Sequence, residues 1–166
     1  MKILVACLVV ITCSCTRTVY VVRHAEKANL PATADRMMAS DPPLSPAGEE
    51  RAEALKLLLE KKNIRAIYST PYKRTVNTVT PLAIASNRPV VNYSPRPDST
   101  NALVDRIKNT GKGNVVIAGH SNTVDDIVNR LAGKAVVPGD LPDSVYNALF
   151  ILKIKGNKVR YSRKTY

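Results

Sequence analysis

"TVYVVRHAEK", residues 18–27, is a short apolar and β-branched run that ends abruptly in Arg23 and His24. Runs of this kind are typical of buried strands, so we expect a strand at Thr18–Val22. The chain has two histidines, and the second, His120, closes a similar run, "NVVIAG", at residues 114–119. Both histidines therefore stand just beyond the ends of predicted strands.

Further strands and helices alternate along the chain. Besides 18–22, the predicted strands are "IRAIYS" at 64–69, "PVVNY" at 89–93, 114–119, and two tail strands around a Gly-Asn turn at 156–157. The predicted helices begin at Ser45-Pro46 and Thr70-Pro71, lie around Leu103 and Ile107, and cover Ser121–Ala132. This alternation predicts a three-layer α/β fold, in which helices flank a mainly parallel central sheet.

Apolar spacing predicts which helix faces are buried. The predicted core positions are Ala52, Leu55, Leu58 and Leu59, then Val76, Val79 and Ala83, and finally Val124, Ile127, Val128 and Leu131. Pro81 is expected to kink its helix or end it early, because proline cannot donate the helical hydrogen bond. Residues 28–43 and "SPRPDS" at 94–99 are expected to be loops.

Composition limits the choice of partners. The chain has 166 residues, a 45% apolar composition and a formal net charge of +12, which suit one folded domain with anionic partners. A nucleic-acid surface is not favoured, because no RNA-binding aromatic motif or zinc-finger spacing is present. The basic tail "KIKGNKVRYSRK" alternates with apolar residues, as a strand with one solvated face would.

The first fifteen residues contain all three cysteines and predict an export signal. An apolar run from Ile3 to Ile11 follows Lys2, and it is too short to span a bilayer. The end of this segment resembles a bacterial lipoprotein signal, with Cys15 as the lipidated residue and Cys13 as the alternative. We expect a signal peptide at 1–15 and an exported, membrane-anchored protein; a first buried strand of a cytoplasmic protein is the competing interpretation.

The cations and histidines are expected to meet at one edge of the sheet. Ligands of parallel sheets bind beyond the carboxyl ends of the strands, where Arg23, His24, Arg74 and His120 fall. Arginine matches phosphate oxygens in bidentate fashion, and a neutral imidazole can attack phosphorus. The pattern therefore predicts a site for a phosphoryl group.

Four motifs in this order resemble the histidine phosphatase superfamily, also called phosphoglycerate mutase-like. They are "VVRHAEK" at 21–27, "LSPAGEERAEAL" at 44–55, "YSTPYKRTVNT" at 68–78 and "AGHSNT" at 118–123. The resemblance runs from Thr18 to the last helix and implies one histidine phosphatase domain over residues 16–166. It further implies phosphomonoester hydrolysis through a phosphohistidine intermediate.

The resemblance also implies a role for each matching residue. His24 matches the nucleophile, and Arg23, Arg74 and His120 match the rest of the phosphate pocket. Arg74 is preferred to Lys73 because the arginine of the family precedes small polar residues, here "TVNT".

Two further residues are expected near the substrate. Lys27 is a candidate phosphate contact, although a surface ion pair with Glu26 is the simpler interpretation. Ser121 is expected to cap the helix that follows His120, and its hydroxyl or backbone N–H to face the anion.

The connection from Asn87 to Asn114 is short and predicts a minimal cap over an open site. An open site favours simple hydrolysis over mutase chemistry, which must exclude water. It also suits phosphoproteins, but these are usually cytoplasmic, so the expected export favours phosphorylated small molecules. No metal or other cofactor is expected, because two histidines and scattered acids do not form a ligand cluster. A non-catalytic anion-binding lipoprotein and a phosphohistidine-protein phosphatase are the alternatives.

An alkoxide leaving group needs a proton donor at neutral pH. Family resemblance places a carboxylic acid between residues 81 and 113, where the chain offers Asp98 and Asp105. Asp98, in the expected loop "SPRPDS", is the preferred candidate. Glu26 and Asp125 are the substitutes, since each lies close to a catalytic histidine in the sequence.

Overall fold

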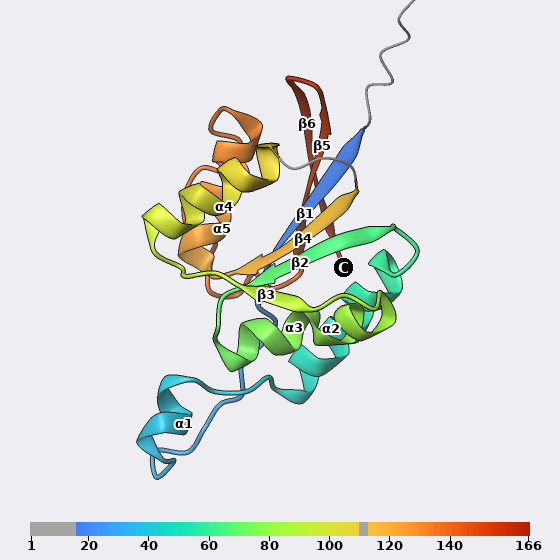
Figure 1. Cartoon of the computed structure of the whole chain (residues 1–166). Helices are drawn as coiled ribbons and strands as arrows, with labels where there is room; N and C mark the ends of the chain where they lie inside the picture. The colour runs from blue at the N-terminus through green and yellow to red at the C-terminus, as the bar shows by residue number, and fades with distance from the viewer. Residues whose placement is uncertain (1–15, 110–112) are drawn as a thin grey trace, which may run out of the picture.

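The computed structural model describes residues 16–109 and 113–166, and its centre is a six-stranded sheet (Figure 1). The strand order is β3-β2-β4-β1-β5-β6. The strands are β1 (Arg17–Arg23), β2 (Ile64–Ser69), β3 (Val90–Asn92), β4 (Asn114–Gly119), β5 (Ala148–Lys155) and β6 (Lys158–Thr165). The four strands from β3 to β1 are parallel, whereas β5 and β6 are antiparallel additions at one edge.

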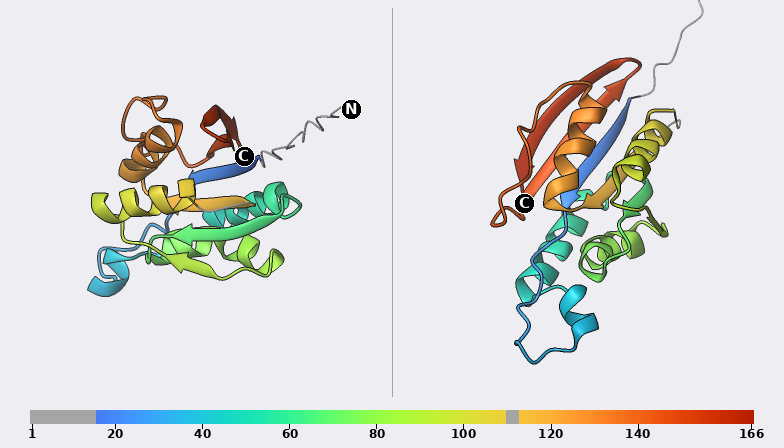
Figure 2. Two further views of the ribbon diagram at one scale, coloured as in Figure 1. Left: turned by 45° about the horizontal axis from the view of Figure 1, so that its top comes forward. Right: turned by 90° about the vertical axis from the view of Figure 1, so that its left-hand side faces the viewer.

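Helices cover both faces of the sheet, as the views in Figure 2 show. The helices α2 (Pro46–Leu59) and α3 (Lys73–Ala85) lie on one face, and α4 (Pro97–Asn109) and α5 (Ser121–Ala132) on the other. Alternate strand residues face the two layers: Val19 and Val21 pack with α4 and α5, and Tyr20 and Val22 with α2 and α3. The predicted three-layer, mainly parallel α/β fold is confirmed.

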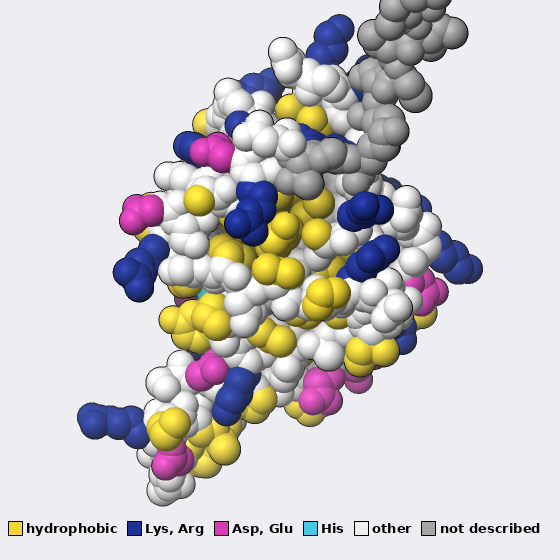
Figure 3. Space-filling model, in the orientation of Figure 1, with side chains coloured by type: hydrophobic (Ala, Val, Ile, Leu, Met, Phe, Trp, Pro, Cys, Tyr) yellow, Lys and Arg dark blue, Asp and Glu magenta, His cyan; other side chains and the backbone are white. Residues whose placement is uncertain are grey.

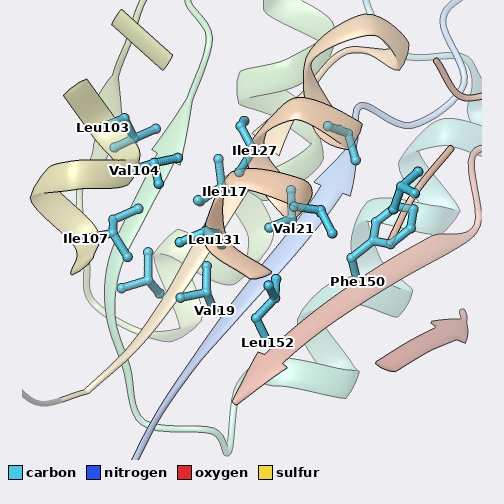
Figure 4. Close-up of a cluster of buried hydrophobic side chains, with 14 of the residues drawn as sticks. Val19, Val21, Leu103, Val104, Ile107, Ile117, Ile127, Leu131, Phe150 and Leu152 are labelled. Carbon is cyan, nitrogen blue, oxygen red and sulfur yellow. The ribbon is translucent and has the colours of Figure 1, made fainter. Parts of the chain in front are cut away.

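The core between the sheet and α4 and α5 is built from buried hydrophobic side chains, most of them aliphatic (Figure 4). All four residues predicted on the face of α5 are buried there: Val124, Ile127, Val128 and Leu131. The face predicted for α2 is correct except at Leu58, whose exposed fraction is 39%. Gly48, near the start of α2, is also buried. A Cβ at this position would lie 2.2 Å from the backbone oxygen of Glu26.

The start of α3 differs from the prediction. The helix begins at Lys73, and Tyr72 is its N-cap residue without a side-chain bond, so Thr70 does not cap it. The carboxylate of Asp41 accepts hydrogen bonds from the backbone N–H of Lys73 at 3.0 and 3.1 Å and so supplies the cap from a distant segment. Pro81 does not end the helix early, because Leu82 and Ala83 beyond it are buried in the core.

Two predicted loops contain helical residues. The segment 28–43 includes the short helix α1 (Arg36–Ser40). Its N-cap residue is Asp35, whose side chain accepts a hydrogen bond from the N–H of Met37 at 2.7 Å. Helix α4 begins at Pro97, so Pro97, Asp98 and Ser99 of "SPRPDS" are helical. Proline is favourable at the first position of a helix, since its missing N–H would be unpaired there.

The tail forms the predicted hairpin, in which Lys155 pairs with Lys158 across Gly156 and Asn157. Between Asn87 and Asn114 the described residues hold only β3, a loop and α4, which agrees with a minimal cap. Within residues 16–109 and 113–166, no helix has the length and apolar character needed to cross a membrane. The predicted signal peptide and Cys15 lie outside the described residues.

Candidate active site

The carboxyl ends of β1 and β4 lie side by side and place both histidines at one edge. Arg23 pairs with Gly119 in the parallel ladder, and the N–H of His24 donates to the carbonyl of Gly119 at 2.8 Å. The N–H of Ala25 donates to Oγ1 of Thr78 on α3 at 2.8 Å. The backbone on both sides of the His24 side chain is therefore held by β4 and α3.

His24 is held as a neutral imidazole with a defined tautomer. Its Nδ1 lies 2.8 Å from the carbonyl oxygen of Ala25, and because a carbonyl only accepts, Nδ1 carries the proton. Burial lowers the pKa of His24 from 6.5 to about 4; the Ala25 bond opposes this shift, and the charges of Arg23 and Arg74 reinforce it. At neutral pH the Nε2 atom therefore keeps its lone pair.

His120 stands beside His24, with ring centroids 5.4 Å apart. Its Nε2 lies 2.9 Å from Oγ1 of Thr70, and its backbone N–H donates to Oγ1 of Thr123 at 2.9 Å. Burial is the main cause that lowers the pKa of His120 to about 4, and nearby arginines add to it. The site thus pairs two uncharged imidazoles.

The Arg23 guanidinium is buried and fixed by the loop that precedes β5. Its Nη1 donates to the carbonyl oxygens of Pro142 and Asp143 at 2.9 and 3.1 Å, and its Nη2 donates to Oδ1 of Asp143 at 3.3 Å. The guanidinium carbon lies 4.3 Å from the centre of the Tyr146 ring. In the described part of the chain, the buried Nε has no hydrogen-bond partner.

Arg74, in the first turn of α3, is held in a similar way. Its guanidinium carbon lies 4.6 Å from the centre of the Tyr72 ring, and Nη1 lies 3.5 Å from Oδ1 of Asp41. The Tyr72 ring in turn contacts the His120 ring, with centroids 5.0 Å apart. Among the described residues, the buried Nε of Arg74 also lacks a hydrogen-bond partner.

These side chains line a cavity of about 560 Å³ that is open to solvent. Its lining includes the cations Arg23, Lys27, Arg74 and Arg96, both histidines, and one carboxylate, Asp143. Tyr72, Pro97 and Ser121 also line it, so the first turns of α3, α4 and α5 all reach the cavity. Helix N-termini carry partial positive charge, so the cavity is suited to an anion such as a phosphoryl group.

The structure brings most predicted site residues together. Arg23, His24, Arg74 and His120 share the cavity, and Lys27 and Ser121 also line it, whereas Lys73 does not. Ser121 is not the cap of α5: the N-cap residue is His120, and Ser121 is the first helical residue.

The carboxylic acids predicted as proton donors lie outside the cavity lining. Asp98 is exposed in the first turn of α4 and does not belong to the cavity lining, although Arg96 and Pro97 before it do. The Glu26 carboxylate accepts hydrogen bonds from Nε and Nη2 of Arg51. Burial would raise the pKa of Glu26, but the bonds and charge of Arg51 lower it overall. Asp125 has its pKa raised by burial, but it lies one turn into α5 and outside the lining.

Four residues at the site are missing from the sequence prediction. Tyr72 and Tyr146 support the two arginines, Arg96 adds a cation, and Asp143 is the lining carboxylate. Tyr72 lies in the motif "STPYKR", so its position was a usable signal. Asp143 and Tyr146 belong to a loop with no periodic pattern, and only the fold brings them to β1.

Metal ligation finds no support in the geometry. In the part of the chain that the structure describes, no group of three or more His, Cys, Asp or Glu side chains could hold a metal ion. The cavity lining has four cations and one carboxylate, and this excess of positive charge would repel a metal ion.

Residues 19–95 match the family model of the histidine phosphatase superfamily (branch 1). Over this span the chain is similar to the histidine phosphatase superfamily. The matched span includes Arg23, His24 and Arg74, and the fold adds His120 from beyond it. No curated protein matches the sequence.

Several solved structures share the fold of this chain. One is a protein from Agrobacterium tumefaciens provisionally assigned as the phosphohistidine phosphatase SixA, at 22% identity and a TM-score of 0.66, covering 90% of this chain and 98% of that one. Another is a mycobacterial glucosyl-3-phosphoglycerate phosphatase, at 12% identity and a TM-score of 0.61, covering 91% and 98%. A third, from Escherichia coli and provisionally assigned as an α-ribazole-5′-phosphate phosphatase, has 11% identity and a TM-score of 0.64, covering 90% and 96%. The family match and the shared fold together support phosphatase activity.

Proposed function

We propose that the protein hydrolyses phosphomonoesters through a covalent phosphohistidine on His24. The observation that carries this proposal is the bond from Nδ1 of His24 to the Ala25 carbonyl, at 2.8 Å in a cationic cavity. It leaves Nε2 unprotonated and free to attack phosphorus.

The reaction has two displacements at phosphorus. In the first, Nε2 of His24 forms the P–N bond, the P–O bond to the leaving group breaks, and the leaving oxygen takes a proton. In the second, water attacks phosphorus, the P–N bond breaks, and inorganic phosphate leaves with one water proton lost. Arg23, Arg74 and His120 stabilise the negative charge that spreads over the phosphoryl oxygens in both steps.

The proton donor is a carboxyl group at the rim of the cavity. Among the described lining residues, Asp143 supplies the carboxylate, and its Oδ1 accepts a hydrogen bond from Nη2 of Arg23 at 3.3 Å. Asp98 is the competing candidate, because it follows Arg96 and Pro97 of the lining. An alkyl phosphate needs the proton and an aryl phosphate with a good leaving group does not, so comparing these substrates tests the role.

For Asp143→Asn we expect turnover of the alkyl phosphate to fall about a hundredfold and that of the aryl phosphate less than about fivefold. Asp98→Asn is the matched variant, with the same chemical change in the first turn of α4. The selective loss appearing in Asp98→Asn alone would assign the proton to Asp98. Equal losses on both substrates in both variants would move the role to Glu26 or Asp125.

The preferred substrates are phosphorylated small molecules. The cavity is open, and the described segment between α3 and β4 is too small to enclose a ligand. The same openness would admit a phosphorylated protein side chain, and one fold neighbour is provisionally assigned as a phosphohistidine phosphatase. A phosphohistidine peptide assayed beside a panel of phosphomonoesters decides between the two classes.

We also propose that the protein is exported and anchored by a lipid on Cys15. This proposal rests on the apolar run from Ile3 to Ile11 and on Ser14 before the cysteine. Intact-mass measurement of protein extracted from membranes tests it. An unmodified Met1 or a free Cys15 thiol would contradict it.

Turnover tests the catalytic proposal against a non-catalytic binding role. His24→Ala is expected to lower turnover of an aryl phosphate at least about a thousandfold, since the nucleophile is lost. Inorganic phosphate should still bind the variant, because the arginines remain. Near wild-type turnover by His24→Ala would refute the mechanism, and absence of turnover by the unaltered protein on every substrate would favour the binding role.

A further inference from the structure

The end of the molecule opposite the cavity is strongly basic. It comprises the amino ends of β1, β2 and β4, the carboxyl ends of α4 and α5, and the tip of the β5–β6 hairpin, and the start of β1 and this tip lie together in Figures 1 and 2. Among the described residues, its cations include Arg17, Lys61, Lys62, Lys108, Lys134, Lys153, Lys155, Lys158 and Arg160. Glu60, beside Lys61, is the one acid next to any of them in sequence.

Four of these cations form a compact group, here called the basic tip: Lys153, Lys155, Lys158 and Arg160. Lys155 pairs with Lys158 and Lys153 with Arg160 across the hairpin, so all four project from one face. All four are exposed, and in the described residues none of them forms an ion pair with an acid. From residue 144 to residue 166 the chain has no Asp or Glu.

Without a partner, repulsion among the cations of the basic tip destabilises the folded hairpin. Like charges directly opposite each other destabilise a strand pair, and here two such pairs are adjacent. In the view of Figure 3 this end is at the top, and most acidic side chains lie lower down. An anionic partner would offset the repulsion within the tip.

The position of β1 indicates which anion is nearest. β1 begins at Arg17, two residues after the proposed lipidated Cys15, and Arg17 pairs with Ile154 beside the basic tip. Two residues span at most about 7 Å, which is shorter than the Debye length of about 8 Å at physiological salt. A lipid on Cys15 would therefore hold the basic tip within the electrostatic field of the bilayer surface.

We propose that the basic tip is a docking surface for an anionic phospholipid bilayer. Lys155 and Lys158 contact the lipid phosphates, and the sheet stands away from the membrane. The cavity lies at the opposite ends of β1 and β4, about 23 Å away for the seven steps from Arg17 to His24. Docking would therefore orient the cavity toward the aqueous phase, from which substrates diffuse. This orientation does not depend on His24 being the nucleophile.

Lysine footprinting on lipid nanodiscs tests this surface. Full-length protein as purified is mixed with discs of phosphatidylcholine alone or with an equal part of phosphatidylglycerol, then briefly acetylated and analysed by peptide mass. On the anionic discs we expect labelling of Lys155 and Lys158 to fall at least about fivefold relative to neutral discs, and 0.5 M salt to restore it. Lys164, about 20 Å from Lys158 at the other end of β6, is the internal control and should change less than about twofold.

Charge reversal provides the matched variants. Lys155→Glu with Lys158→Glu should weaken binding to phosphatidylglycerol vesicles at least about tenfold, whereas Arg163→Glu with Lys164→Glu, the same charge change in the same hairpin, should weaken it less than about threefold. Equal labelling of Lys155 and Lys158 on both discs, or equal effects of the two variants, would overturn the proposal. Protection of Lys155 and Lys158 from acetylation by duplex DNA, without protection on anionic discs, would assign the basic tip to nucleic acid. That result would also overturn the proposal.

Discussion

Acidification should weaken the fold through the two active-site histidines. Both are neutral in the folded protein, because burial and nearby arginines lower their pKa values to about 4. In the unfolded chain each histidine returns to its ordinary pKa of about 6.5. Below that value the unfolded state binds more protons than the folded state, so the free energy of unfolding must fall as the pH falls.

The size of the effect follows from these two pKa values. Between pH 7 and pH 5.5 each histidine lowers the free energy of unfolding by about 1 kcal/mol, so the two together lower it by about 2 kcal/mol. In this window the loss depends almost entirely on the unfolded pKa, because the folded protein takes up few protons until the pH approaches 4. Most carboxyl groups titrate below this window, so the histidines dominate it.

Urea unfolding at pH 5.5, 6.2 and 7.0 measures the slope. The variant with both His24→Asn and His120→Asn is a clean control, because the chain contains only these two histidines. We expect its free energy of unfolding to change by less than about 0.5 kcal/mol over the window, against about 2 kcal/mol for the unaltered protein. Equal slopes in the two proteins would show that the histidines are not held neutral and would refute the electrostatic account of the site.

Three substitutions test how the site is positioned. Asp41→Asn should raise KM for a phosphomonoester several-fold with a smaller change in kcat, because the carboxylate that holds Arg74 is lost; steady-state kinetics check this. Thr78→Val should lower the free energy of unfolding by about 1–3 kcal/mol in urea titrations, since two buried hydrogen bonds are removed, and a change below about 0.3 kcal/mol would contradict their role. Gly48→Ala should lower Tm by several degrees in thermal melts, because the new Cβ would lie 2.2 Å from the Glu26 carbonyl; an unchanged Tm would show that α2 shifts freely.

The central sheet and its helices were predictable because their signals are local. Thr18–Val22 and "NVVIAG" are buried runs of strand length, and Val124, Ile127 and Leu131 repeat at the helical period. Where the local structure differs from the prediction, a distant group decides it. Asp41 caps α3 in place of Thr70. Of the two outcomes expected at Pro81, a kink or an early end, the early end does not occur, because Leu82 beyond it packs in the core.

The site was predictable as far as it lies at strand ends. Arg23 is the last residue of β1, and His24 and His120 follow β1 and β4 directly, so topology alone brings them together. Asp143 and Tyr146 lie in the long connection between α5 and β5, where no periodicity fixes the path of the chain. Their place beside Arg23 follows from backbone carbonyls binding its guanidinium, which the sequence does not reveal.

Trapping the covalent intermediate tests the proposed mechanism most directly. The protein is mixed with a ³²P-labelled phosphomonoester, quenched in base within milliseconds, and digested for peptide mapping. The account predicts an acid-labile, base-stable phosphate on the peptide that contains His24, formed faster than turnover and absent from His24→Ala. Turnover without any labelled protein, or label on His120 in place of His24, would contradict it.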